Sequence, residues 1–326
     1  MSPSSTELSS TPGESTASLI PRRLPHRDVY GRAVAPGAGT VVNALATGRG
    51  SAFALDVETT ASVRLTPDSG VDGVIDGAPD GDTSLIERCV ETVVERFGDD
   101  QGGRVRTASE VPTAAGLKSS SAAANATVLA TLAALDVSVE AGGAPSPADA
   151  CRIGVDAARE AGVTVTGAFD DASASMLGGV TVTDNTDDTL LDHASFDREA
   201  AVWTPPERAY SADTDTAACE RVAPVAAHAV ELALAGNVET AMTVNGLAFS
   251  AALDYSTAPA VEAMPHCGGV SLSGTGPSVV AVGGDLGRVA DAWRDREGTV
   301  RQTTTRETGA RILARGDGEP PNDWGL

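Results

Sequence analysis

The chain has 326 residues, of which 41% are hydrophobic and 3% aromatic, and its formal net charge is -22. This size and hydrophobic content predict a globular protein with a large core, and the acidic charge argues against nucleic acid or an anionic membrane as a general partner. No apolar run reaches the ~18–20 residues of a membrane span, and four widely spaced cysteines indicate neither a zinc site nor a disulfide framework, so we expect a cytoplasmic protein with reduced thiols.

The acidic surplus indicates adaptation to strong salt. Asp and Glu outnumber Lys and Arg by 45 to 23, and Lys118 is the only lysine. A dense acidic surface binds water and repels neighbouring molecules, which helps a protein stay soluble in strong salt. We therefore interpret the composition as that of a halophile.

The first third of the chain predicts strands followed by helices. Residues 1–28 are rich in Ser, Thr and Pro and read as a disordered extension. Small and β-branched residues with glycine punctuation predict strands over 31–66. Apolar residues at helical spacing predict a helix over 82–98. A strand over 103–111 ends at Pro112, and an alanine-rich helix follows from about Ser120.

The remainder alternates helices and strands without a regular βαβ period. We expect a helix over 146–162, a strand over 178–185, and an acidic, turn-rich boundary over 183–197. The elements expected after it are a strand at 199–206, helices at 219–235 and 238–253, a strand–turn–strand unit at 268–284 and a helix at 286–296. This order favours an α+β protein of two layered domains. We predict an extension (1–28), two domains (29–187 and 188–316) and a tail (317–326).

The loop "VPTAAGLKSSS" (111–121) lies between a predicted strand and a predicted helix. Unpaired N–H groups at a helix start suit a phosphate, small residues let it approach, and a lysine adds positive charge. A plain serine N-cap beside an incidental lysine is the structural alternative. The pattern is not a Walker A loop, because Leu117 separates Gly116 from Lys118.

Three segments together resemble a known superfamily. "PTAAGLKSSSAAAN" is similar to the phosphate-binding motif of the galactokinase, homoserine kinase, mevalonate kinase and phosphomevalonate kinase (GHMP) superfamily. "APGAGTVVNALATGRGSAFAL" and "GVSLSGTGPSVVAV" resemble its first and last motifs, in the same order. The forms "GLKSSSAAANA" and "TGAFDDASASMLGG" resemble the archaeal shikimate kinases within it.

The resemblance implies a fold and an activity. The fold would be a ribosomal S5 domain 2-like, ATP-binding N-terminal domain with a ferredoxin-like C-terminal domain. The activity would be ATP- and Mg²⁺-dependent phosphorylation of the 3-hydroxyl of shikimate in chorismate biosynthesis, by a monomer or homodimer. The rivals are homoserine kinase and a non-catalytic ATP-binding regulator on the same scaffold.

The resemblance also implies site residues. Counting from Gly178 places the functional aspartate at Asp171, with Asp170 as the neighbouring candidate. Glu160, eleven residues before Asp171, and Ser120 would bind magnesium. Lys118 would face the phosphates. Several relatives have a lysine beside the aspartate at the position of Ala38; here either Lys118 or an arginine would supply that positive charge, or the aspartate would only position the hydroxyl. The nucleotide would contact Pro112, Thr113, Ala114, Ala115, Gly116, Leu117, Lys118, Ser119, Ser120, Ser121, Gly274, Thr275 and Gly276.

Overall fold

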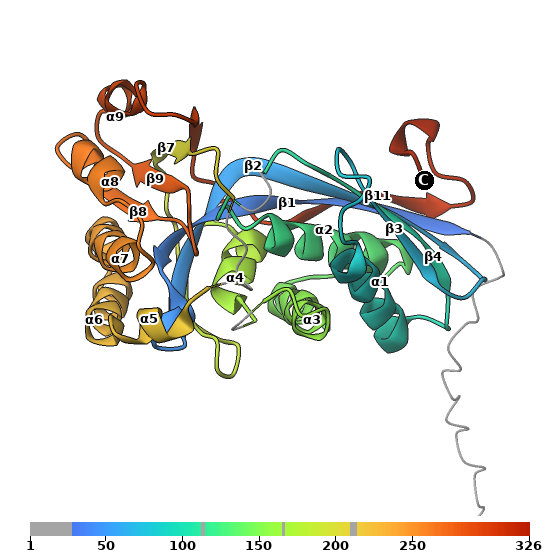
Figure 1. Ribbon diagram of the computed structural model, residues 1–326. Helices are drawn as coiled ribbons and strands as arrows, with labels where there is room; N and C mark the ends of the chain where they lie inside the picture. Colours follow the sequence, from blue (N-terminus) through green and yellow to red (C-terminus); the bar gives the residue numbers. More distant parts are fainter. Residues whose placement is uncertain (1–27, 112–114, 165–166, 209–213) are drawn as a thin grey trace, which may run out of the picture.

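A long two-stranded ribbon runs through the whole molecule. The computed structural model describes residues 28–111, 115–164, 167–208 and 214–326. Strands β1 (Val29–Val42) and β2 (Arg49–Thr66) pair antiparallel and are joined through the short 3-10 helix η1 (Ala44–Ala46). The ribbon starts in the larger half of the molecule and its far end reaches the smaller half (Figure 1).

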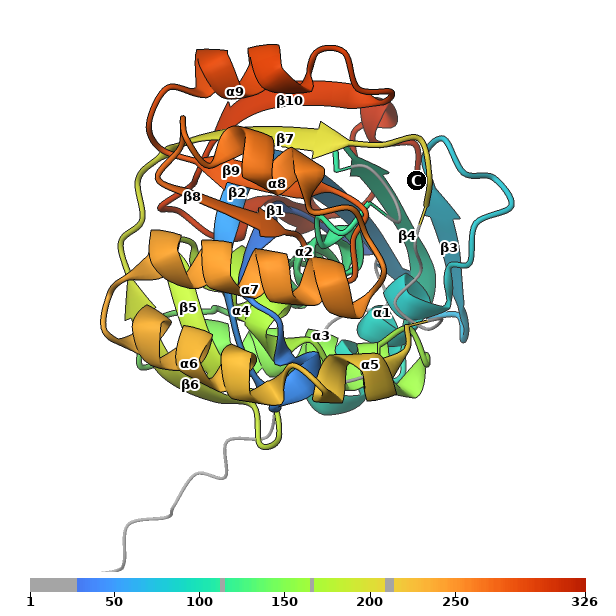
Figure 2. The same cartoon turned by 60° about the vertical axis from the view of Figure 1, so that its left-hand side comes forward.

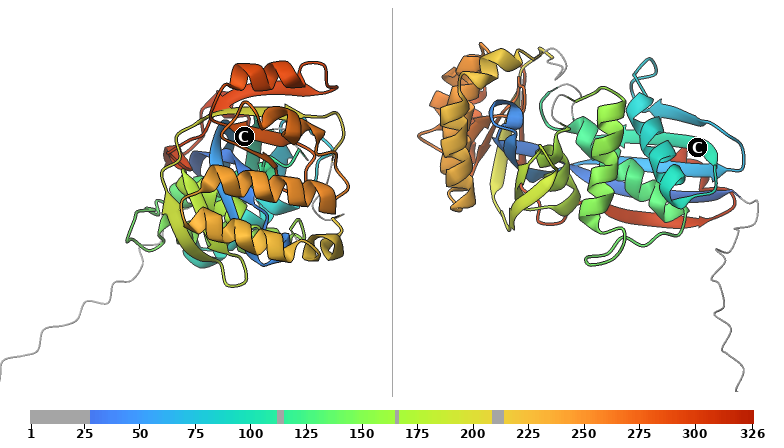
Figure 3. Two further views of the ribbon diagram at one scale, coloured as in Figure 1. Left: turned by 90° about the vertical axis from the view of Figure 1, so that its left-hand side faces the viewer. Right: turned by 90° about the horizontal axis from the view of Figure 1, so that it is seen from below.

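The larger half is a seven-stranded sheet covered on one face by helices. Its main order is β11-β1-β2-β4-β3, with β5 paired to β2 and β6 to β5, and only β3 and β4 pair parallel. Helices α1 to α4 lie below the sheet in Figure 1, and Figure 3 shows them from below. The elements are β3 (Val71–Ile75), β4 (Gly102–Ser109), β5 (Val180–Asp184), β6 (Thr189–Ala194), β11 (Arg311–Asp317), α1 (Ser84–Phe97), α2 (Ser119–Ala134), α3 (Pro147–Glu160) and α4 (Phe169–Leu177).

Helix α2 is the central helix of this half. It contacts β1, β2, α1, α3 and α4, and nearly all of its residues after Ala122 are buried. A helix that is apolar on every side suits such a position, which explains its run of Ala, Val and Leu. The flanking α3 starts at Ser146, whose side chain forms a capping box with Asp149.

The smaller half is a four-stranded sheet, ordered β10-β7-β9-β8, with helices packed around it (Figure 2). Val41 and Phe53, at the far end of the β1–β2 ribbon, share one hydrophobic core with Met242 and Val280 of this half. The ribbon thus joins the two cores. The elements are β7 (Glu199–Thr204), β8 (Gly269–Leu272), β9 (Val279–Val282), β10 (Thr299–Thr304), α5 (Thr216–Glu220), α6 (Ala223–Leu234), α7 (Val238–Ala252), α8 (Ala258–Ala263) and α9 (Leu286–Trp293).

The α+β prediction is confirmed, and two segments differ from expectation. The acidic stretch 183–197, expected as a turn-rich boundary, holds strand β6. The arginine-rich segment 301–316, whose charges suggest either a solvated helix face or binding of a substrate carboxylate, forms most of β10 and β11. The division between 187 and 188 stays a proposal, because β6 and β11 follow it in the chain and yet pair in the larger sheet. In the tail, Trp324 packs edge-on against Tyr30, with ring centroids 5.2 Å apart.

Across the described ranges, no helix combines the length and the apolar character needed to cross a membrane.

The surface charge leads to a prediction about salt. The chain has 45 acidic and 23 basic residues, so ion pairs such as those of Arg88 with Glu91 and Glu95 leave many acidic side chains without a basic partner. Repulsion among these charges reaches ~30 Å at 0.01 M salt but only ~3 Å at 1 M. We expect loss of structure in dilute buffer, measured by circular dichroism, and rising activity toward molar KCl, measured by an assay of the activity that the resemblance implies. An unchanged spectrum and full activity in dilute buffer would contradict the halophilic interpretation.

Candidate active site

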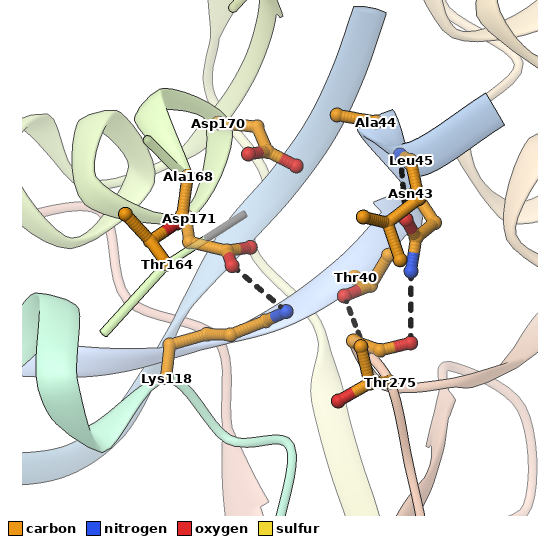
Figure 4. Close-up of a pocket in the computed structure, with 11 residues that line it drawn as sticks. Thr40, Asn43, Ala44, Leu45, Lys118, Thr164, Ala168, Asp170, Asp171 and Thr275 are labelled. Atoms are coloured by element: carbon orange, nitrogen blue, oxygen red, sulfur yellow. Dashed lines mark hydrogen bonds and ion pairs between the residues drawn. The ribbon is translucent and has the colours of Figure 1, made fainter. Parts of the chain in front are cut away.

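The three segments singled out by their motifs meet at one cleft. It opens where the end of β1 and η1 face the starts of α2 and α4, with the turn between β8 and β9 beside them (Figure 4). The residues that line it are Thr40, Asn43, Ala44, Leu45, Lys118, Thr164, Ala168, Asp170, Asp171, Gly274 and Thr275.

Lys118 and Asp171 form an ion pair inside this cleft. The Lys118 Nζ lies 3.0 Å from Asp171 Oδ2, and the side chains are 9% and 14% exposed. Lys118 is the residue before α2 and has a left-handed backbone (φ 64°), while Asp171 lies in the first turn of α4. Of the alternatives left open by the sequence, the structure therefore supports Lys118 as the cation beside the aspartate. Ala38, which stands where several relatives have a lysine, is fully buried in β1 and carries no charge.

Asp171 keeps one oxygen unused. Its Oδ1 is buried and has no hydrogen-bond partner within the described ranges. A buried, unpaired carboxylate oxygen is costly, and a donor from a bound molecule would remove that cost. Figure 4 shows the Asp171 side chain extending into the cleft, where a bound molecule that uncovers this oxygen would supply such a donor.

Asp170 is the more deeply buried of the two aspartates. Its carboxylate accepts a hydrogen bond from Asn185 Nδ2 (2.8 Å), and its backbone N–H donates to Asn185 Oδ1 (3.2 Å). Burial first, and the negative charge of Asp171 second, raise the pKa of Asp170 to about 7, while Lys118 and Asn185 act in the opposite direction. Asp170 therefore gains its charge near neutral pH.

This raised pKa leads to a prediction about stability. The folded protein retains a proton on Asp170 that the unfolded chain releases near the ordinary pKa of 3.8, so stability falls as pH rises from about 4 toward 7. Asp170→Asn removes that ionisation and should raise Tm at pH 8 more than at pH 5. Thermal unfolding in constant high salt measures this.

A neighbouring residue provides the control. The Thr186 hydroxyl, first among several causes, lowers the pKa of Asp184, so Asp184→Asn should give no gain in Tm at pH 8. Equal Tm shifts for Asp170→Asn at pH 5 and pH 8 would contradict the prediction.

Hydrogen bonds tie the wall opposite the aspartates together. The Gly274 N–H donates to Thr40 Oγ1 (2.8 Å), and Asn43 Nδ2 donates to the Gly274 carbonyl (2.9 Å). The Ser273 hydroxyl donates to the Gly116 carbonyl (2.8 Å). Gly274 has φ 62°, and a Cβ there would lie 2.6 Å from Lys118 Nζ, so glycine is required for the lysine to reach its position.

The predicted phosphate loop is partly described. Ala115 and Leu117 are buried, Gly116 is held by Ser273, and Gly276 lies beyond the cleft lining at a turn. Ser119, Ser120 and Ser121 form the first turn of α2, with Ser120 exposed. Pro112, Thr113 and Ala114 lie outside the described residues.

The structure does not bring Glu160 to the cleft. Its side chain is 52% exposed and forms an ion pair with Arg88 of α1, on the outer side of α3. Glu160 lies on the part of α3 that faces α1, so its position does not support the predicted magnesium role.

The sequence did not single out Thr40, Asn43, Thr164 or Asn185. Asn43 and Thr40 lie within the first motif, where polar residues interrupt an apolar run. That interruption was the available signal for these two residues. Asn185 follows a strand and its role depends on contact with Asp170.

Comparison with known proteins gives concordant results. A family model described as "GHMP kinases N terminal domain" matches residues 84–179. The chain is 66% identical over 284 residues to the shikimate kinase of Halobacterium salinarum, covering 86% of this chain and 99% of the relative. It is 47% identical over 287 residues to the shikimate kinase of Methanosarcina mazei, covering 86% and 96%. A homoserine kinase structure from Cytophaga hutchinsonii matches with TM-score 0.66 and 16% identity, covering 91% of this chain and 100% of that one, which shows likeness of fold alone.

Proposed function

The chain belongs to the shikimate kinases of the GHMP kinase superfamily, and from this we infer that its cleft transfers the γ-phosphoryl group of ATP to the 3-hydroxyl of shikimate. The 66% identity over 99% of a curated shikimate kinase supports the reaction. The observation that supports the site is the buried Lys118–Asp171 pair, with a carboxylate oxygen left unpaired in the cleft.

We propose that Asp171 receives the proton of the reacting hydroxyl. The hydroxyl of shikimate donates to Asp171 Oδ1, and its oxygen attacks the γ-phosphorus as the bond from that phosphorus to the bridging oxygen breaks. The proton passes to Asp171 and ADP leaves. Lys118 holds the carboxylate in place through Oδ2, which leaves Oδ1 for the substrate.

The start of α2 is the proposed place for the ATP phosphates. The first N–H groups of a helix lack intrahelical partners and favour anions, and Gly116 and Ser119 offer little bulk there. Lys118 adds positive charge at the same point.

The residues present fit a magnesium ion that is held mainly by phosphate oxygens. The Ser120 hydroxyl, a hard oxygen donor exposed in the first turn of α2, suits an ion bound through one or two protein ligands plus substrate phosphates. We propose the Ser120 hydroxyl as one ligand and, given its position, not Glu160. When bound, Mg²⁺ would neutralise charge on the phosphates.

An assay with two substrates tests the proposed reaction. Purified enzyme in molar KCl receives ATP with either shikimate or homoserine, ADP release is measured, and ³¹P NMR locates the phosphate on the product. We expect turnover of shikimate with the phosphate on the 3-oxygen. Preference for homoserine would favour that kinase, and ATP binding without turnover of either would favour a regulator. We further propose that the enzyme is cytoplasmic and that it is a monomer or a homodimer. Sedimentation would distinguish these two oligomeric states.

A further inference from the structure

Two carboxylates face the same cleft, and proton transfer needs only one of them. Asp171 is paired with Lys118, whereas Asp170 has no cation within ion-pair distance among the described residues. Both extend from the first turn of α4 toward the wall that carries Thr40 and Asn43 (Figure 4). The second carboxylate therefore calls for a role of its own.

The surroundings of Asp170 hold its carboxylate rigidly. Asn185 Nδ2 donates to Oδ1, the Asp170 N–H returns to Asn185 Oδ1, and the Thr183 hydroxyl donates to that same Asn185 oxygen (2.8 Å). Two side chains on or next to β5 thus fix the orientation of Asp170 before any substrate binds.

The other oxygen, Oδ2, is left for a donor. Asn185 is the side-chain donor to Asp170 in the described ranges, and it uses Oδ1. Oδ2 lies against Gly50 of β2, where a Cβ would be only 2.3 Å from it, so the glycine preserves space for this oxygen. The residue as a whole is 5% exposed, and a carboxylate oxygen that lacks a side-chain donor in such surroundings gains from a hydroxyl offered by a ligand.

We propose that Asp170 binds the 4-hydroxyl of shikimate, next to the one phosphorylated, and so makes the cleft selective for a ring with adjacent hydroxyls. Resting on the proposed function, this gives the two neighbouring aspartates one hydroxyl each: Asp171 the reacting one and Asp170 its neighbour. The substrate carboxylate then points away from both aspartates, because like charges repel. Homoserine has a single hydroxyl and cannot satisfy both.

The test pairs one substitution with one altered substrate. Wild type and Asp170→Asn are compared on shikimate and on 4-deoxyshikimate, at saturating ATP. A charge-assisted hydrogen bond corresponds to about 10–150-fold in kcat/KM. We expect wild type to lose about this factor on 4-deoxyshikimate, and Asp170→Asn to lose it on shikimate, mainly through KM, with little further loss on the deoxy substrate.

The outcomes separate this inference from the proposed function. Wild type that turns over neither substrate would refute the function itself. Two outcomes would overturn the inference but leave the proposed function intact. In the first, wild type and Asp170→Asn discriminate equally against 4-deoxyshikimate. In the second, wild type uses both substrates equally well. Asp184→Asn, the same chemical change outside the cleft lining, should leave the substrate ratio unaltered. If Asp170→Asn fails to fold, Asp170→Ser replaces it, and the same comparison of substrate ratios between variant and wild type decides.

Discussion

Asp171→Asn is expected to lower kcat about 10²–10⁴-fold while the affinity for ATP is retained. The amide keeps the shape of the side chain but is not a base, so the proton of the attacking hydroxyl has no acceptor. Because Oδ1 is otherwise unpaired, the substitution removes a function without breaking a described hydrogen bond of that atom. Steady-state kinetics with shikimate and ATP would measure the loss of kcat, and calorimetry would measure whether nucleotide binding is retained.

Asp170→Asn is the matched control for this substitution. It changes the adjacent residue in the same helical turn, and we expect its loss to lie in KM for shikimate and to be the smaller of the two. A wild-type kcat for Asp171→Asn would refute the assignment of the proton acceptor. A reversed ranking of kcat would transfer that role to Asp170.

Lys118→Ala is expected to reduce kcat/KM for ATP about 10–150-fold, the range of a charge-assisted hydrogen bond. The Lys118 side chain is 9% exposed and its ammonium faces Asp171, so its removal leaves a carboxylate in the cleft without its cation. The main loss should appear in kcat, and shikimate affinity should change little. Lys118→Arg should restore only part of the rate, because a planar guanidinium does not fit where a compact ammonium packs against Gly274.

A double mutant separates the two possible roles of this lysine. If Lys118 acts by holding Asp171, then Lys118→Ala combined with Asp171→Asn should cost little more kcat than Asp171→Asn alone. Multiplied losses would instead indicate an independent contact with the phosphates. Wild-type kcat/KM for ATP in Lys118→Ala would mean that the loop works through its backbone and serines.

The elements that the sequence predicts well are those with strong local signals. Helix α3 has a Ser-Pro start and amphipathic spacing, and β1 and β2 have small and β-branched residues between glycines. Strands β6 and β11 have mostly exposed or half-buried residues, so alternation between apolar and polar positions is weak in them. Their place in the sheet depends on long-range pairing, such as Val29 with Asp317, which no local pattern reveals.

The motifs located the cleft but not its internal contacts. They identified Lys118 and Asp171 but left the source of the positive charge open. The ion pair joins the residue before α2 to the first turn of α4, a contact between distant segments that no motif shows. Glu160 shows the opposite case, where a spacing taken from relatives selected a side chain that pairs with Arg88 outside the cleft. Contacts across elements, such as Asn185 with Asp170, required the fold.

Lys118 also makes the protein unusual as a target for covalent chemistry. It carries the only lysine ε-amino group in 326 residues, so an amine-selective acylating reagent has one internal site of attack, and that site lies in the cleft. Acylation requires a free, uncharged amine, and this one is paired with Asp171 and largely shielded from solvent. The yield of modification at a single peptide therefore reports how often the ion pair opens, with no background from surface lysines.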